Sequence, residues 1–478
     1  MGQAACRVGR GAGATSSRRM DYSTRRAEEP PAAAPQPPLA SSGQHVLMNS
    51  HQSSAVFNIV NSIIGSAIIG LPYSINQAGL PLGILLLFWV AYVTDFSLIL
   101  LIKGGVLSGT HSYQALVRKT FGLPGYLLLS LLQFSYPFIA MISYNIIIGD
   151  TLCKVLQRIS GVDPGNFFIG RHFIIGVATV LFSLPLSLYH DIAKLGKVSL
   201  TSAVLTAMIL IFVIIRAFTL GPYITRTEDA WVFAKPNAVQ AVGVMSFAFI
   251  CHHNSFLVYG SLKEPTVAKW SRVIHIAVMI SALISVLFAT TGYLTFTGLT
   301  QGDLFENYCK SDALINGGRF CYGITVILTY PLECFVTREV VANVFFHGNL
   351  SKRYHAIVTT VIITMATTVS MMIDCLGIVL DLSGVLCAAP LIFIIPSACY
   401  LKLSEERWIH PDKIMSSVTL LNGVVVMIVG FVMTIRYPDD CSHGQEMAYC
   451  LSTNFFNNSF SSFEPTIQPS VLNTSTVQ

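Results

Sequence analysis

The sequence predicts an all-α integral membrane protein with eleven membrane-spanning helices. Of its 478 residues, 53% are hydrophobic and only 11% are charged, whereas soluble domains average about 25% charged residues. Apolar runs recur between residues 55 and 435, and a spanning helix needs roughly 20 such residues. The formal net charge of +5 is small, so the composition requires no nucleic-acid partner.

The spans follow one another with short connections. The fourth and fifth windows are short, and Gly196 between them supports two helices rather than one. The expected spans are 54–78, 81–103, 125–150, 172–190, 198–217, 237–259, 273–297, 320–343, 354–374, 376–400 and 415–435.

The spans divide the chain into segments. Residues 1–50 are basic and Pro-rich, without an apolar stretch that would make a cleaved signal peptide, so we expect a disordered cytoplasmic tail. The expected segments after it are a first five-helix repeat (51–217), a second five-helix repeat (218–402), an eleventh helix (403–436) and an outer tail (437–478).

Charge sets the expected orientation. Most of the 29 Lys and Arg residues fall on one side when the N-terminus is placed in the cytoplasm, as the positive-inside rule requires. An odd number of spans then places the C-terminus outside the cell or in a lumen. The tail carries glycosylation acceptor sequences at Asn457 and Asn473, which agree with this side. We expect the plasma membrane rather than an endolysosomal one.

The first span is built to break at its centre. Gly65, Ser66, Ala67 and Gly70 are small or flexible, and Pro72 follows them. Glycine is a poor helix residue and proline donates no amide hydrogen. Unwound backbone at membrane depth is tolerated where it faces protein or a water-filled cavity, so a binding cavity is expected here.

Span six shows a second interruption. Gly243 precedes a polar run from Cys251 to Ser255, and Gly260 closes the span. Adjacent polar residues at bilayer depth are costly unless they line a cavity. Breaks in spans one and six are what an inverted repeat of five helices predicts, with the eleventh helix added.

Three motifs carry a family resemblance. Span one reads N-S-I-I-G-S-A-I-I-G-L-P-Y, span six S-F-A-F-I-C-H, and span eight L-T-Y-P-L-E-C-F-V-T-R. Together they resemble the amino acid/auxin permease superfamily and its sodium-coupled neutral amino acid transporter family, over residues 54–435. The resemblance implies a LeuT-like five-plus-five repeat with broken helices one and six. His253 stands where the family has proline, which puts the second break and substrate choice in doubt.

An α-amino acid needs partners for a carboxylate and an ammonium group. The free amides and carbonyls of unwound helices supply both. Small residues in membrane helices also serve close helix packing, which is the alternative for the first break. His252 is a candidate hydrogen-bond partner or pH sensor. The expected substrate-binding residues are Ser62, Ile63, Gly65, Ser66, Ala67, Ser246, Phe249, Cys251 and His252.

Sodium prefers several oxygen ligands. The family resemblance places the cation between spans one and eight, on Asn61 and Thr329, with the carbonyls of Ile64 and Thr325 completing the site. Thr325 and Thr329 share one helix face. The alternative is that each threonine hydroxyl bonds the carbonyl four residues earlier in its own helix.

Asp95, Glu333 and Asp381 are acidic residues inside spans, where carboxylates are functional candidates. Asp95 is expected to pair with a basic residue or to face the interior, and Asp381 to act at the outer gate. For Glu333 we expect an ion pair with Arg338 rather than a proton relay.

The 11 cysteines show no C-x-x-C spacing, so no zinc or redox motif is predicted. The family's outer bridge joins the loops after spans five and seven, and no cysteine lies between residues 216 and 235 to form it. Cys309 with Cys321, or Cys441 with Cys450, are the candidate substitutes.

These observations predict a secondary transporter that carries small neutral amino acids inward together with sodium. The expected partners are the amino acid, sodium and the lipid bilayer, with no resident cofactor. The alternatives are a proton-coupled transporter on the same fold, and an amino-acid sensor that signals through its N-terminal tail without transport. An enzyme is disfavoured because the sequence has no paired catalytic acids, no G-x-S-x-G motif and no metal-ligand spacing.

Overall fold

The computed structural model describes residues 52–160, 167–189, 196–346, 348–373, 375–437 and 446–450. Within these ranges the protein is helical and contains no strand. The expected N-terminal tail, Asn457, Asn473 and Cys441 lie outside the described residues. The α-helices are α1 (Gln52–Ile63), α2 (Leu71–Ala78), α3 (Leu80–Ser108), α4 (Tyr113–Ser160), α5 (Arg171–Ala178), α6 (Leu184–Leu188), α7 (Gly196–Thr219), α8 (Ala238–Phe249), α9 (His252–Ser261), α10 (Val267–Phe296), α11 (Ala313–Phe345), α12 (Lys352–Met372), α13 (Leu376–Ser383), α14 (Ile395–Leu403) and α15 (Pro411–Arg436).

Shorter helical turns join or interrupt these helices. The 3-10 segments are η2 (Ser66–Gly70), η3 (Phe167–Ile169), η6 (Gly221–Tyr223), η7 (Thr297–Leu299) and η8 (Leu304–Asn307). The π-helical segments are η4 (Thr179–Ser183), η9 (Gly384–Ala388) and η10 (Pro390–Ile394).

The number of spans agrees with the sequence. Among the described residues, ten segments are long and apolar enough to cross a membrane, and α1 with α2 forms an eleventh, bent by 50°. Helix α4 includes a non-helical residue at Gly122, and the part that follows this kink begins close to the expected start of the third span at residue 125. Gly122 has φ 71°, a conformation that glycine adopts without a Cβ penalty, so the helix kinks there.

Spans four and ten are helical but not uniformly α. In span four η4 separates α5 from α6, and in span ten η9 and η10 separate α13 from α14. Pro185, Pro390 and Pro396 lie within or next to these stretches. Each proline lacks an amide hydrogen, and π-turns accommodate the lost hydrogen bond.

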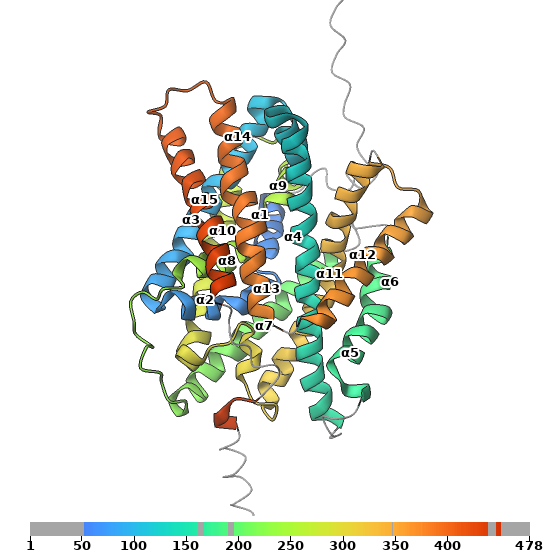
Figure 1. Ribbon diagram of the computed structural model, residues 1–478, viewed down its shortest axis with the longest axis vertical. Helices are drawn as coiled ribbons and strands as arrows, with labels where there is room; N and C mark the ends of the chain where they lie inside the picture. Colours follow the sequence, from blue (N-terminus) through green and yellow to red (C-terminus); the bar gives the residue numbers. More distant parts are fainter. Residues whose placement is uncertain are drawn as a thin grey trace, which may run out of the picture. The chain divides into compact units, whose positions relative to one another are not determined.

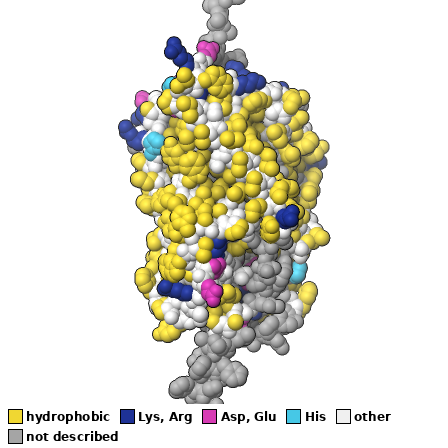
Figure 2. Space-filling model, turned by 60° about the vertical axis from the view of Figure 1, so that its left-hand side comes forward, with side chains coloured by type: hydrophobic (Ala, Val, Ile, Leu, Met, Phe, Trp, Pro, Cys, Tyr) yellow, Lys and Arg dark blue, Asp and Glu magenta, His cyan; other side chains and the backbone are white. Residues whose placement is uncertain are grey.

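Long helices surround the two broken spans (Figure 1). The long helix α4 packs against α11 and α12, while α3 packs against α10 and α14. Inside this frame α1 contacts α10 and α9, and α2 contacts α8 and α10. Hydrophobic side chains cover most of the face in Figure 2, as expected for a surface that meets lipid.

Candidate functional site

Span one is broken where the sequence predicts. Helix α1 ends at Ile63, the next two residues are non-helical, and η2 leads into α2. A Cβ at Gly65 would lie 3.9 Å from the carbonyl oxygens of Asn61 and Ser62. Backbone oxygens at the end of a helix lack their intrahelical partners, so the break offers the polar backbone that a small zwitterion requires.

The predicted substrate residues of span one gather around this break. Ile63 and Ala67 are buried, and Ser62 is half-buried. The Ser62 hydroxyl donates to the carbonyl of Asn58 at 2.9 Å, which leaves its lone pairs to accept a hydrogen bond. The Ser66 side chain lies outside what the structure describes.

Span six is also broken, and it breaks without a proline. Helix α8 ends at Phe249 and α9 begins at His252, so residues 250 and 251 are non-helical. The amide of Asn254 then bonds the carbonyl of Cys251 at 3.1 Å in the first turn of α9. The doubt raised by His253 about the second break is therefore removed.

His252 is held by a residue that the sequence did not single out. Its Nε2 lies 2.8 Å from the Ser97 hydroxyl of α3, and that hydroxyl donates to the carbonyl of Thr94 at 3.0 Å. Ser97 therefore accepts from His252, which places the proton on Nε2 and leaves Nδ1 as an acceptor. Nδ1 is buried and has no hydrogen-bond partner in the described part of the chain, so it is available to a ligand group.

The other predicted residues of span six are fully buried. The Ser246 hydroxyl donates to the carbonyl of Val242 at 2.6 Å, while Phe249 and Cys251 have no exposed surface. Behind them Tyr136 of α4 lies 5.5 Å from the ring of His253. Aromatic and sulfur groups therefore surround the second break.

The predicted cation ligands lie on two separate helices. Thr329 donates to the carbonyls of Thr325 and Val326 at 2.9 and 3.1 Å, and Thr325 donates to Cys321 at 3.0 Å. Each hydroxyl thus donates to the carbonyl four residues earlier in its own helix, which was the alternative to cation binding. The lone pairs of each hydroxyl oxygen can still bind a cation. Asn61 is half-buried in α1. Helix α1 packs mainly on α10, and α11 mainly on α4 and α7.

Of two in-span carboxylates, one has the kind of partner that was expected and the other does not. Asp95 pairs with His275 at 2.8 Å, so the expected basic partner is confirmed. The expected pair of Glu333 and Arg338 is wrong: Arg338 donates to the Ser187 carbonyl and the Thr359 hydroxyl, at 3.0 and 2.9 Å. The reason is spacing, because helical residues three or four apart face each other and residues five apart do not.

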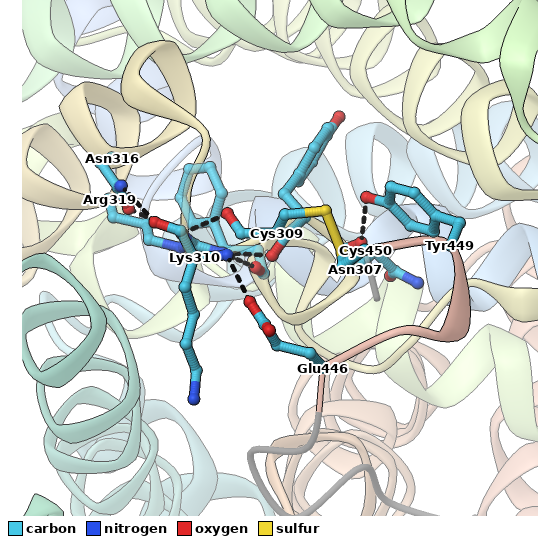
Figure 3. The surroundings of a disulfide bond; sticks show 10 residues. Asn307, Cys309, Lys310, Asn316, Arg319, Glu446, Tyr449 and Cys450 are labelled. Carbon is cyan, nitrogen blue, oxygen red and sulfur yellow. Dashed lines mark hydrogen bonds between the residues drawn. A yellow bond between two sulfur atoms is a disulfide. The ribbon is translucent and has the colours of Figure 1, made fainter. Parts of the chain in front are cut away.

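The predicted disulfide of Cys309 with Cys321 is wrong, as is that of Cys441 with Cys450. Cys309 is bonded to Cys450, 141 residues away, and Cys321 is a free cysteine within α11. Figure 3 shows the segment before Cys450 lying on the loop that precedes α11. Tyr449 donates to the carbonyl of Asn307 at 2.8 Å, and these contacts bring Cys450 to Cys309. Cys375 is also disulfide-bonded.

Comparison with known proteins decides the family. The family model described as "Transmembrane amino acid transporter protein" matches residues 48–436, which include every described span. The chain belongs to the transmembrane amino acid transporter family. This multi-pass membrane protein is an amino acid transporter.

The relatives of this transporter agree with that assignment. Proteins named "Putative sodium-coupled neutral amino acid transporter 11" are 72% identical in Bos taurus, over 92% of this chain and 96% of the relative. The one in Danio rerio is 63% identical, over 85% and 91%. Vacuolar amino acid transporter 2 of Saccharomyces cerevisiae is 30% identical, over 82% and 84%.

Solved structures show the fold of this transporter. MhsT in complex with L-phenylalanine aligns with a TM-score of 0.53 at 13% identity, over 80% of this chain and 99% of that chain. A manganese transporter of Eremococcus coleocola aligns with a TM-score of 0.51 at 13% identity, over 86% and 94%. Both have the LeuT fold, so the expected LeuT-like architecture is confirmed. Relatives and fold neighbours are transporters, which confirms that the chain is not an enzyme.

Proposed function

We propose that this transporter moves small neutral amino acids into the cytosol together with sodium. The observation that carries the proposal is the pair of helix breaks, one in each five-helix repeat, because their backbone groups can bind both charges of an amino acid without a charged side chain. The printed name of the vertebrate relatives supports sodium and a neutral substrate. The electrochemical gradient would supply the work, at about 2.3 kcal/mol per charge per 100 mV.

In this proposal Asn61 and Thr329 hold sodium, with the carbonyls of Ile64 and Thr325. The lone pairs of Thr329 support this role, since its proton is already donated within α11. Sodium binding would draw α1 towards α11 and so order the adjacent substrate site, which explains coupling. No resident cofactor takes part. The substrate would occupy the space between the break at Gly65 and the break at Cys251, with Nδ1 of His252 as an acceptor for its ammonium group.

We further propose that the N-terminus is cytoplasmic and the C-terminus lies outside, in the plasma membrane. The disulfide of Cys309 with Cys450 supports the side, because disulfides persist in oxidising compartments. Asn457 and Asn473 are then accessible for glycosylation. Glycosidase treatment should increase the mobility of the protein on a gel, and the Asn457→Gln and Asn473→Gln double variant should lose this shift; the result tests whether the C-terminal tail lies outside. Surface labelling of intact cells tests whether the protein is in the plasma membrane.

The decisive experiment is uptake of labelled alanine or glutamine into proteoliposomes, with sodium replaced by choline. We expect uptake to require sodium and Asn61→Ala to raise the half-saturating sodium concentration on the order of tenfold, the effect of one lost ligand. Asn58→Ala, one turn earlier, is the matched control and should leave the sodium curve unchanged. Uptake that is the same in choline as in sodium, or that is driven by an inward proton gradient, would instead favour the proton-coupled alternative. Binding without uptake would favour the sensor.

A further inference from the structure

One carboxylate in α11 lacks a positively charged partner. The Oε2 atom of Glu333 is buried and has no hydrogen-bond partner among the described residues. Arg338, the basic residue expected beside it, bonds Ser187 and Thr359 instead. The Tyr144 hydroxyl of α4 donates a hydrogen bond to the carboxylate, but no basic side chain in the described part of the chain offsets its charge. An ionised carboxylate at membrane depth is costly without such a partner.

The Glu333 carboxylate lies next to the break in span six. The hydroxyl of Tyr136 in α4 is close enough to the Glu333 carboxylate and the Cys251 thiol to interact electrostatically with both. The ring of Tyr136 lies 5.5 Å from that of His253 and 5.3 Å from that of Phe247. Tyr136 therefore connects Glu333 to residues on both sides of the break.

The Glu333 side chain borders a space inside the helix bundle. The residue is only half-buried, although it lies within a membrane span. The two tyrosines beside its carboxylate, Tyr136 and Tyr144, are only 7% and 4% exposed, which indicates that the exposed surface of Glu333 faces the interior. Thr329, the proposed sodium ligand, lies four residues earlier on the same face of α11. Four residues advance a helix by about 6 Å, so Glu333 lies about one turn beyond the sodium site.

A substrate with a basic side chain would supply the missing positive charge. The proposed function places the amino-acid backbone between the breaks at Gly65 and Cys251, and its side chain is then free to reach Glu333. An apolar side chain would leave the carboxylate unpaired, and a neutral amide would offset only part of the cost of its burial. An ammonium or guanidinium group forms a charge-assisted hydrogen bond with a carboxylate, roughly twice as strong as a neutral one.

We infer that Glu333 binds the side chain of the substrate, and that this transporter accepts amino acids with long basic side chains in addition to neutral ones. The terminal ammonium group of lysine, or the guanidinium group of arginine, would donate to Oε2 of Glu333. Tyr144 would keep its hydrogen bond to the carboxylate. The inference rests on the substrate site of the proposed function, but it requires no particular coupling ion.

The test is uptake of labelled lysine, beside labelled alanine, into proteoliposomes that contain the full-length protein. We expect the wild type to take up both. In Glu333→Gln the ratio of kcat/KM for lysine to that for alanine should fall on the order of tenfold or more, because one charged partner is lost. Glutamine has the shape of glutamate and still accepts from Tyr144, and a purely structural defect would leave this ratio unchanged. Asp95→Asn removes another in-span carboxylate and should also leave the ratio unchanged.

Binding gives a second measurement that does not depend on transport. A ligand raises the thermal unfolding midpoint of the protein that binds it, so midpoints are recorded against lysine and against norleucine, which has the same carbon chain without the terminal amine. The wild type should be half-saturated by lysine at a concentration on the order of tenfold lower than by norleucine.

The outcomes separate this inference from the proposed function. Uptake of alanine without uptake of lysine overturns the inference and leaves the proposed function standing, and so does an unchanged ratio in Glu333→Gln. Should Glu333→Gln fail to fold, norleucine that binds as tightly as lysine overturns the inference. In a protein without any uptake, lysine binding that Glu333→Gln weakens upholds the role of Glu333 while refuting the proposed function.

Discussion

At the scale of single residues, one side chain can donate a hydrogen bond within the protein and still keep an acceptor atom for a ligand. The Thr329 hydroxyl donates its hydrogen bond within α11, and its oxygen lone pairs can still accept or bind a cation. His252 likewise donates a hydrogen bond from Nε2 to the Ser97 hydroxyl of α3 and keeps Nδ1 as an acceptor. In the proposed function, these acceptors would meet the ligands without a formal charge buried beside the backbone of the substrate.

Asp303, in the loop before α11, provides a residue-scale prediction. Burial, with Glu306 nearby, raises the pKa of Asp303 to about 7 from 3.8. Because the folded-state pKa is the higher one, the stability from this group is present below about pH 3.8 and is lost as the pH rises through about 7. Asp303→Asn keeps the hydrogen bond to the Phe305 amide and should raise the unfolding midpoint at about pH 8, with little change at about pH 4.

Thermal unfolding of the wild type and the Asp303→Asn variant across this pH range checks the prediction. Glu264→Gln, at an exposed carboxylate, is the matched control and should leave the profile unchanged. An equal gain for Asp303→Asn at both pH values would show that the effect does not come from ionisation.

At the scale of elements, spans six and ten meet through backbone rather than through long side chains. Helix α8 of span six crosses the start of η9 at Gly243 and Gly384. A Cβ at Gly243 would lie 2.7 Å from Val385 Cγ1, so the crossing has room only for hydrogen at both glycines. This contact holds α8 against α13, where Gln240 Nε2 donates a hydrogen bond to Asp381 Oδ2.

Gly384→Ala is therefore predicted to be strongly destabilising. The added Cβ would overlap the carbonyl oxygen of Gly243, a backbone atom that cannot move without shifting α8. Overpacking of this kind costs about 1–3 kcal/mol or more. Gly260→Ala is the control, since no atom lies within 4 Å of its Cβ position. Thermal unfolding compares the two variants, and an unfolding midpoint for Gly384→Ala as high as that of Gly260→Ala would refute the packing argument.

At the scale of the whole molecule, the disulfide closes a large loop that contains the last four spans. It ties the segment at Cys450 to the loop before α11, across a sequence separation of 141 residues. Glu446 reinforces the contact by accepting from the amide of Lys310 at 2.9 Å (Figure 3). The C-terminal segment is therefore part of the folded transporter at this face.

Cys450→Ser should lower the free energy of unfolding by about 2–5 kcal/mol, because a long loop gains entropy in the unfolded chain. Denaturant or thermal unfolding without reductant measures the change. Cys321→Ser is the matched control, since Cys321 is free, and should be close to neutral. The stabilising role is ruled out if both serine variants unfold at the same midpoint.

The sequence by itself determined the all-helical membrane class, the number of spans and both breaks. These follow from local composition, since a run of apolar residues defines a span and glycine, proline or adjacent polar residues interrupt it. It also reached the family through three motifs that lie on the breaks and on span eight. The sequence could also have drawn attention to Gln77 and Gln240, because they are polar residues inside apolar spans.

The tertiary structure alone decided the pairings. Cys309 joins Cys450 rather than Cys321, and Arg338 bonds Ser187 and Thr359 rather than Glu333. Gln77 meets Asp381 across 304 positions of sequence. Such partners are set by which helices pack together, and a helix offers each side chain several neighbours that sequence spacing cannot rank. The coordinates also answered the question that His253 raised, because the second break forms at residues 250 and 251 without a proline.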